Sequence, residues 1–159
     1  MSKIIQGLFE SKIKKLNLQI SRLNQNGSFD EEVANLNKYL CILISSYVEK
    51  VFVEKLLNHC EKKCGKQTLR YIQLDLKWTT NLDTAKTEKI LEKFSVNWKS
   101  LLKEDIRYSE ISNALDSIYN NRNQIAHGAD IDISNRDLMS WYSTLQYFFI
   151  QLDYILTKK

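Results

Sequence analysis

Residues 33–57, VANLNKYLCILISSYVEKVFVEKLL, decide the fold class of this 159-residue chain. Apolar residues recur in this stretch three and four positions apart, which is the spacing of one face of an α-helix. They are Val33, Leu36, Leu40, Leu43, Tyr47 and Val51. From Cys41 onward apolar residues also fall on the other faces, so neighbours should cover this helix on more than one side. We expect a long helix over residues 29–63, either central in a bundle or at the interface of a dimer.

The composition supports an all-α fold. The chain has no proline and only four glycines, which leaves too few turn signals for a many-stranded sandwich or barrel. Hydrophobic residues make up 43% and charged residues 26%, as in ordinary globular domains. We therefore expect a single helical domain over residues 1–159, with an N-terminal helix in residues 1–27 and a bundle core in residues 28–159.

The segments on both sides of the long helix also carry helical spacing. Helices are expected over residues 9–26, 67–78, 84–102 and 109–126, and from Ser134 to the end of the apolar pattern near residue 156. Ser28 and Glu31 have the spacing of a capping box before the long helix. Ser95 is a candidate for a bend, and Trp78 is a candidate for the inward face of its helix, beside Leu76.

Charge, cysteines and hydropathy limit the classes of function. With 23 basic and 19 acidic side chains the net charge is +4, which permits an anionic partner. The three cysteines and the absence of a signal-peptide pattern indicate a reduced, cytoplasmic protein. No uninterrupted apolar run is long enough to span a membrane. Cys60, Cys64 and the neighbouring His59 fall short of the four ligands of a structural zinc site, so we expect no metal and no cofactor.

One segment carries candidate chemistry: residues 120–128, NNRNQIAHG. Arg122 continues the apolar stripe of the preceding helix, so its guanidinium should either pair with a carboxylate or line a cleft. Asn123 and His127 are four positions apart and share a helix face. Gly128 supplies a residue type that commonly ends a helix.

These residue types suit cleavage of an RNA backbone without a metal. A histidine can move a proton to or from the ribose 2′-hydroxyl or the leaving oxygen, and an arginine can bind the phosphate. Asn123 could orient the imidazole or hold a phosphate oxygen. A second interpretation stays open, because an arginine and a histidine near a helix C-terminus also complement the helix dipole.

The segment resembles the R-x(4–6)-H motif of HEPN domains, with Arg122, His127 and a polar residue, Asn123, directly after the arginine. Over residues 33–156 the chain is most similar to the RiboL-PSP type, including the tryptophan-bearing helix around Trp98 and the aromatic-rich last helix. The resemblance implies an up-and-down bundle of about five to six helices that dimerises. It also implies one composite ribonuclease site built from two motifs.

By the same resemblance Arg122 and His127 are catalytic and Asn123 is their polar companion. Glu49 is a further catalytic candidate, since an acid on the long helix approaches the motif in some relatives. The alternatives for Glu49 are a solvated face and an ion pair with Arg122.

We therefore expect a homodimeric, metal-independent endoribonuclease that leaves a 2′,3′-cyclic phosphate and acts as a toxin or antiviral effector. The alternative is a non-catalytic helical module that binds RNA or a partner protein, such as a nucleotidyltransferase antitoxin. Two groups of basic residues either follow an RNA backbone or form solvated faces. These are Lys12, Lys14 and Lys15, and Lys62, Lys63, Lys66 and Arg70. The aromatic residues at positions 141, 142 and 147–149 have core or dimer-interface spacing rather than the pattern of a base-stacking surface.

Overall fold

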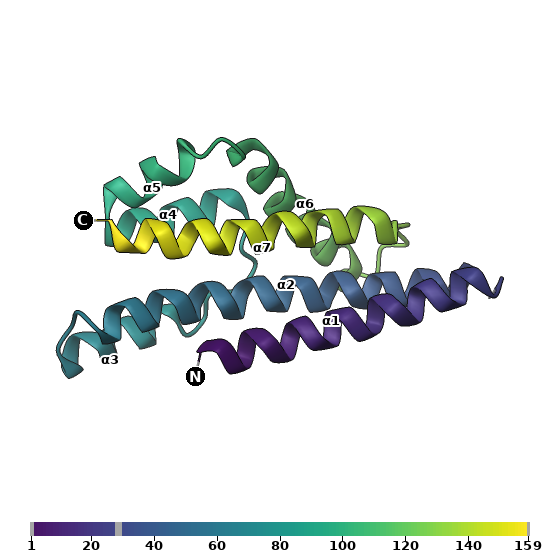
Figure 1. Cartoon of the computed structure of the whole chain (residues 1–159), viewed down its shortest axis with the longest axis horizontal. Helices are drawn as coiled ribbons and strands as arrows, with labels where there is room; N and C mark the ends of the chain where they lie inside the picture. Colours follow the sequence, from purple (N-terminus) through teal and green to yellow (C-terminus); the bar gives the residue numbers. More distant parts are fainter. Residues whose placement is uncertain (1, 28–29, 159) are drawn as a thin grey trace.

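A computed structural model describes residues 2–27 and 30–158, and these residues form seven helices and no strand (Figure 1). The helices are α1 (Ser2–Gln25), α2 (Asp30–Glu61), α3 (Lys66–Leu76), α4 (Thr84–Phe94), α5 (Val96–Lys103), α6 (Tyr108–Ala126) and α7 (Asn135–Thr157). The all-α fold is confirmed. The capping box at Ser28 lies outside the described residues.

The helix expected over residues 84–102 is two helices, α4 and α5, which meet at Ser95. Ser95 adopts an extended conformation (φ −161°, ψ 129°), while its N–H still donates to the carbonyl oxygen of Leu91 and closes the last turn of α4. The new direction lets Trp98 bury its ring and donate from Nε1 to the carbonyl oxygen of Lys158 at 3.1 Å. The expected bend is therefore a full break, which raises the number of described helices to seven.

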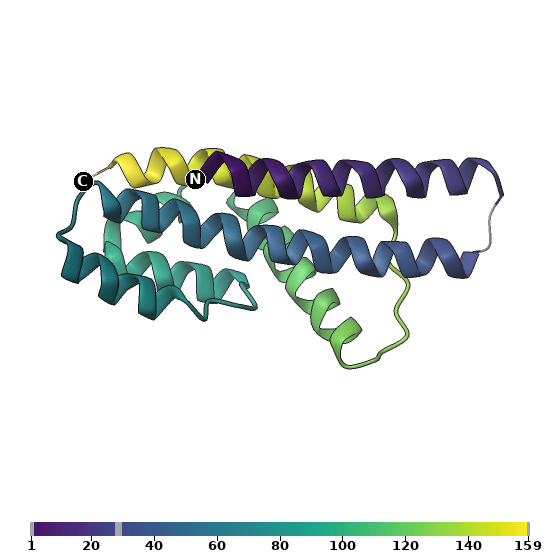
Figure 2. The same ribbon diagram turned by 90° about the horizontal axis from the view of Figure 1, so that it is seen from below.

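The long helix α2 lies at the centre of the bundle, which was one of the two positions expected for it. It packs against α1, α3, α6 and α7, and Figures 1 and 2 show α1 running antiparallel along it. Tyr47 is fully buried where α1, α2 and α7 meet, with its ring in edge contact with Phe9, Tyr142 and Phe149. Burial on several sides explains why apolar residues occupy more than one face of α2.

The last helix contributes most of its aromatic side chains to the core, as the spacing predicted. Tyr142, Phe148 and Phe149 are buried, and Trp141 and Tyr147 pack against the core from half-buried positions. Within residues 2–27 and 30–158, every helix is too short or too polar to cross a lipid bilayer.

The prediction for Trp78 is wrong, because its side chain is 76% exposed. The face of α3 toward α2 is already filled by Leu69, Ile72 and Leu76, and α3 ends at Leu76. Trp78 lies in the turn that follows, on the outside of the molecule.

The helix that carries the motif is α6, and it crosses α2 near the end of the N-terminal third of α2. Cys41 Sγ contacts the carbonyl oxygen of Ile118 at 3.9 Å, and Lys38 Nζ bonds Asp130 Oδ1 at 3.1 Å. In Figure 2 the C-terminal half of α6 extends beyond the bundle before residues 129–134 return the chain to α7. This crossing places the motif at the periphery of the molecule.

Candidate functional site

The apolar stripe of α6 carries Arg122 out of the core. Ile111, Leu115 and Ile118 are buried, whereas Arg122, one turn later, is half-buried. No carboxylate oxygen of the described residues lies within 4 Å of its guanidinium, which donates a hydrogen bond from Nη1 to Asn123 Oδ1 at 3.4 Å. The structure therefore provides no ion pair for Arg122, and most of its five donors remain available to a ligand.

His127 ends α6, and its position depends on a backbone motif. Gly128 N–H donates to the carbonyl oxygen of Ile125 at 3.1 Å, and Ala129 N–H donates to that of Gln124 at 2.9 Å. This pair of bonds is the Schellman arrangement, which needs a left-handed residue at the position of Gly128 (φ +74°). The imidazole of His127 is exposed and makes no side-chain hydrogen bond to the described residues.

Asn123 lies between Arg122 and His127 on α6. Its side chain is half-buried and on the same face of the helix as His127. Its side-chain oxygen accepts from Arg122 rather than from the imidazole. The structure thus joins Arg122 to Asn123 and leaves His127 beside them without a direct side-chain bond.

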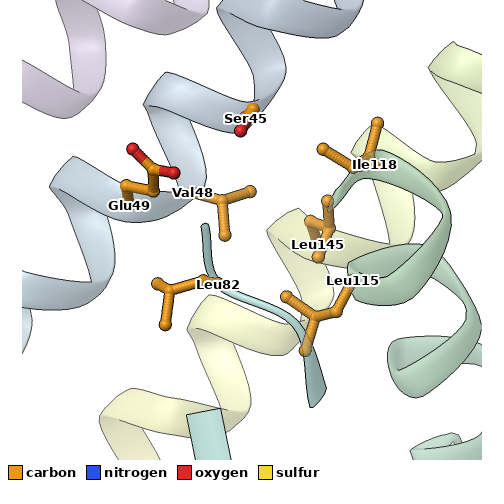
Figure 3. Close-up of a pocket in the computed structure, with 7 residues that line it drawn as sticks. All are labelled: Ser45, Val48, Glu49, Leu82, Leu115, Ile118 and Leu145. Atoms are coloured by element: carbon orange, nitrogen blue, oxygen red, sulfur yellow. The ribbon is translucent and has the colours of Figure 1, made fainter. Parts of the chain in front are cut away.

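The structure places Glu49 away from this cluster. Its Oε1 accepts the backbone N–H of Asn81 at 2.6 Å, and Asn81 has a left-handed conformation (φ 55°) in the segment between α3 and α4. In Figure 3 the carboxylate points away from Leu115 and Ile118 of α6. The apolar residues in that view pack too closely to admit a water molecule. No ion pair joins Glu49 to Arg122 within the described residues.

A groove of about 430 Å³ lies between α4 and α6. Its α6 wall is lined by Ser112, Asp116 and Asn120, which are four positions apart. A step of three from Asn120 and then one of four continue the same helix face to Asn123 and His127. This wall lies outside the R-x(4–6)-H motif, and helical spacing counted backward from Asn123 is the sequence signal that indicates it.

The floor of the groove is polar and already bonded to the protein. Asp116 Oδ1 accepts the N–H of Thr84 at 2.9 Å, and the hydroxyl of Tyr108 donates to Glu88. Burial, together with the bond to Glu88, raises the pKa of Tyr108 to about 12, so its hydroxyl keeps its proton at neutral pH.

Other reactive side chains do not form a site. Burial raises the pKa of the Cys41 thiol to about 12, so it stays protonated and is a poor nucleophile. The ring of His59 packs edge-on against Trp98 at 5.1 Å. Across the described part of the chain, no three His, Cys, Asp or Glu side chains gather closely enough to hold a metal ion.

Comparison with known proteins identifies the family. A family model described as RiboL-PSP-HEPN matches residues 8–158, and so includes most of α1, which lay outside the range of the sequence resemblance. Neither the curated proteins nor the solved structures gave a match. Because the matched range spans almost all of the helices described above, this chain belongs to the RiboL-PSP-HEPN family, a family of helical HEPN domains.

Proposed function

We propose that the protein is a metal-independent endoribonuclease whose motif comprises Arg122, Asn123 and His127. Membership of a HEPN family suggests a nuclease or another RNA-related function. The observation that carries the finer proposal is the Arg122 guanidinium. It is half-buried, lacks a carboxylate partner among the described residues and lies at the end of α6 where His127 is exposed. A partly buried guanidinium without a carboxylate partner favours the binding of an anionic ligand such as a phosphate.

The chemistry follows from the groups present. The His127 imidazole takes the proton of a ribose 2′-hydroxyl, whose oxygen attacks the adjacent phosphorus, and the bond from phosphorus to the 5′ oxygen breaks. The leaving oxygen takes up a proton, which yields a 2′,3′-cyclic phosphate and a 5′-hydroxyl. Arg122 binds the phosphate oxygens as negative charge gathers on them, and Asn123 holds the guanidinium in place.

A second copy of the chain completes the proposed site. Accepting one proton and delivering another at the same moment calls for two groups, and each chain brings one motif histidine. The peripheral position of the α6 C-terminus leaves the motif accessible to another copy (Figure 2). We propose a homodimer that acts on RNA as a toxin or antiviral effector. We assign Glu49 a structural role outside this site, in holding the segment between α3 and α4 through its bond to the Asn81 N–H.

RNA cleavage in the presence of EDTA tests this function. Purified protein should convert single-stranded RNA to products ending in a 2′,3′-cyclic phosphate and leave the matching DNA intact. His127→Ala should lower the rate by roughly 10²- to 10⁴-fold, the usual contribution of a general acid or base. Arg122→Ala should lower it to a similar degree, whereas Arg136→Ala, an exposed arginine on α7, should leave it unchanged.

Two outcomes would count against the enzyme. Cleavage that persists undiminished in both motif variants would trace to a contaminant. RNA binding without any product would instead favour a non-catalytic HEPN module that holds RNA or a partner protein.

A further inference from the structure

Helix α3 has two apolar faces, of which only one is used by the fold. Leu76 is buried toward α2, and Leu69 and Ile72 are half-buried on the same side. On the opposite side of α3 the side chains of Tyr71 and Leu74 are 73% and 50% exposed. Trp78, which follows the end of the helix, is 76% exposed. Their spacing of three and four positions aligns them in one row. Two large aromatic side chains therefore lie open on the surface, about 10 Å apart along the helix direction.

A row of basic residues runs directly beside the aromatic row. Lys66, Arg70 and Lys77 are all exposed, and their separations of four and eleven positions put them on one side of the helix. Lys77 still has helical dihedral angles, and its Nζ lies 4.9 Å from the centre of the Trp78 ring. We call the six side chains of these two rows the α3 platform. They are Tyr71, Leu74, Trp78, Lys66, Arg70 and Lys77.

The charge of the chain is concentrated at this place. Residues 61–78 contain five basic and two acidic side chains, a net charge of +3, against +4 for the whole chain. One of the two acids, Asp75, lies on the far side of the aromatic row from the basic row, where it pairs with Lys93 at 3.3 Å. The platform therefore faces solvent with aromatic rings and an uncompensated row of positive charge.

We propose that the α3 platform is a second binding site for single-stranded RNA, separate from the motif. Exposed aromatic rings stack on unpaired bases, and a parallel basic row neutralises the phosphates of the same strand. The row of lysine and arginine on one side of the aromatic rings favours a regularly spaced polyanion over an apolar protein partner. RNA as the ligand rests on the proposed function.

The platform extends along α2 from its C-terminal end toward the motif. Helix α3 begins after Glu61 and returns along α2, so that Lys77 lines the same pocket as Glu49, whereas α6 contacts α2 at Cys41, about 12 Å further along α2 at the rise of an α-helix. In Figure 2 both α3 and the C-terminal end of α6 lie below α2. One RNA strand held at α3 could then reach the motif, so the platform selects RNA with an unpaired segment on one side of the cleavage point.

Fluorescence anisotropy with a labelled oligoadenylate tests the proposal. The titration is run in EDTA in the His127→Ala background, which keeps the probe intact. The double variant Tyr71→Ala/Trp78→Ala should raise the Kd at least tenfold. Replacing Lys66, Arg70 and Lys77 with Gln should reduce the slope of log Kd against log salt by about two, since each phosphate contact on a single strand contributes about 0.7.

The matched control is Tyr154→Ala on α7. Tyr154 is also exposed and has a lysine, Lys158, over its ring at 4.3 Å, but it lies outside the platform. Its Kd should stay at the parent value. Thermal unfolding of each variant shows whether it is folded, and exposed positions on α3 should leave the Tm nearly unchanged.

The outcomes separate the platform from the proposed function. An unchanged Kd in the double variant, with RNA cleavage intact in the wild-type background, overturns the platform and leaves the nuclease standing. A raised Kd in a protein that never cleaves RNA supports the platform and removes the nuclease. If the double variant only converts a dimer to a monomer in light scattering, the surface joins two copies and the proposal is overturned.

Discussion

At the scale of single residues, Gly128 determines the position of His127 at the end of α6. Its left-handed backbone (φ +74°) allows the two hydrogen bonds that end α6 directly after His127. A Cβ at this position would meet no atom within 4 Å, so the need for glycine comes from the backbone conformation alone.

Gly128→Ala should destabilise the protein by about 1 kcal/mol, because an L side chain disfavours the left-handed region. Urea unfolding measures this loss in the free energy of unfolding. The rate of RNA cleavage should fall by a larger factor than this loss accounts for, because the hydrogen bonds that fix the backbone around His127 are weakened. Gly7→Ala is the matched control: it also has open space, but it lies inside α1, where alanine is the better helix former, so the substitution should add about 0.5–1 kcal/mol. Equal effects of the two substitutions would contradict the assigned role of Gly128.

At the scale of elements, α4 depends on a side-chain cap and α5 does not. Asp83 Oδ1 accepts the Lys86 N–H at 2.7 Å at the start of α4, where the helix also lines the groove beside α6. Ser95 precedes α5 without a side-chain cap bond. The two helices thus offer a capped and an uncapped N-terminus in one molecule.

Asp83→Ala should lower the free energy of unfolding by about 1 kcal/mol, because an N–H at the helix start loses its partner. Ser95→Ala should change it by less than half as much. Chemical denaturation followed by circular dichroism compares the two variants. A loss of equal size in both would show that the Asp83 hydrogen bond contributes little.

At the scale of the whole molecule, the proposed site belongs to two chains, and mixing inactive variants tests that directly. Arg122→Ala and His127→Ala proteins should each be inactive alone. After subunit exchange, mixed dimers hold one arginine and one histidine at the shared site, whereas each parent dimer lacks one of these residues altogether. The remaining histidine can accept the proton while water replaces the missing histidine as proton donor, so a small part of the activity should return, as measured by RNA cleavage in EDTA. A mixture that stays inactive although light scattering shows exchange would contradict a composite site, as would full activity in a monomer.

Helical spacing in residues 33–57 and along α6 was enough to predict the all-α class, a long helix covered on more than one side, and the position of Arg122, Asn123 and His127 near a helix end. These features depend on residues three and four positions apart, so the local sequence determines them. The R-x(4–6)-H resemblance added the family, which the match over residues 8–158 confirms.

Three features depended on contacts between distant segments. The break at Ser95 follows from the burial of Trp98 against the end of α7. Trp78 is exposed because neighbouring residues already fill the α2-facing side of α3. Glu49 bonds the backbone of Asn81, a partner 32 positions away, rather than Arg122. Periodicity determines which side of a helix is apolar, but only packing decides which neighbour covers it and which apolar face stays open to solvent.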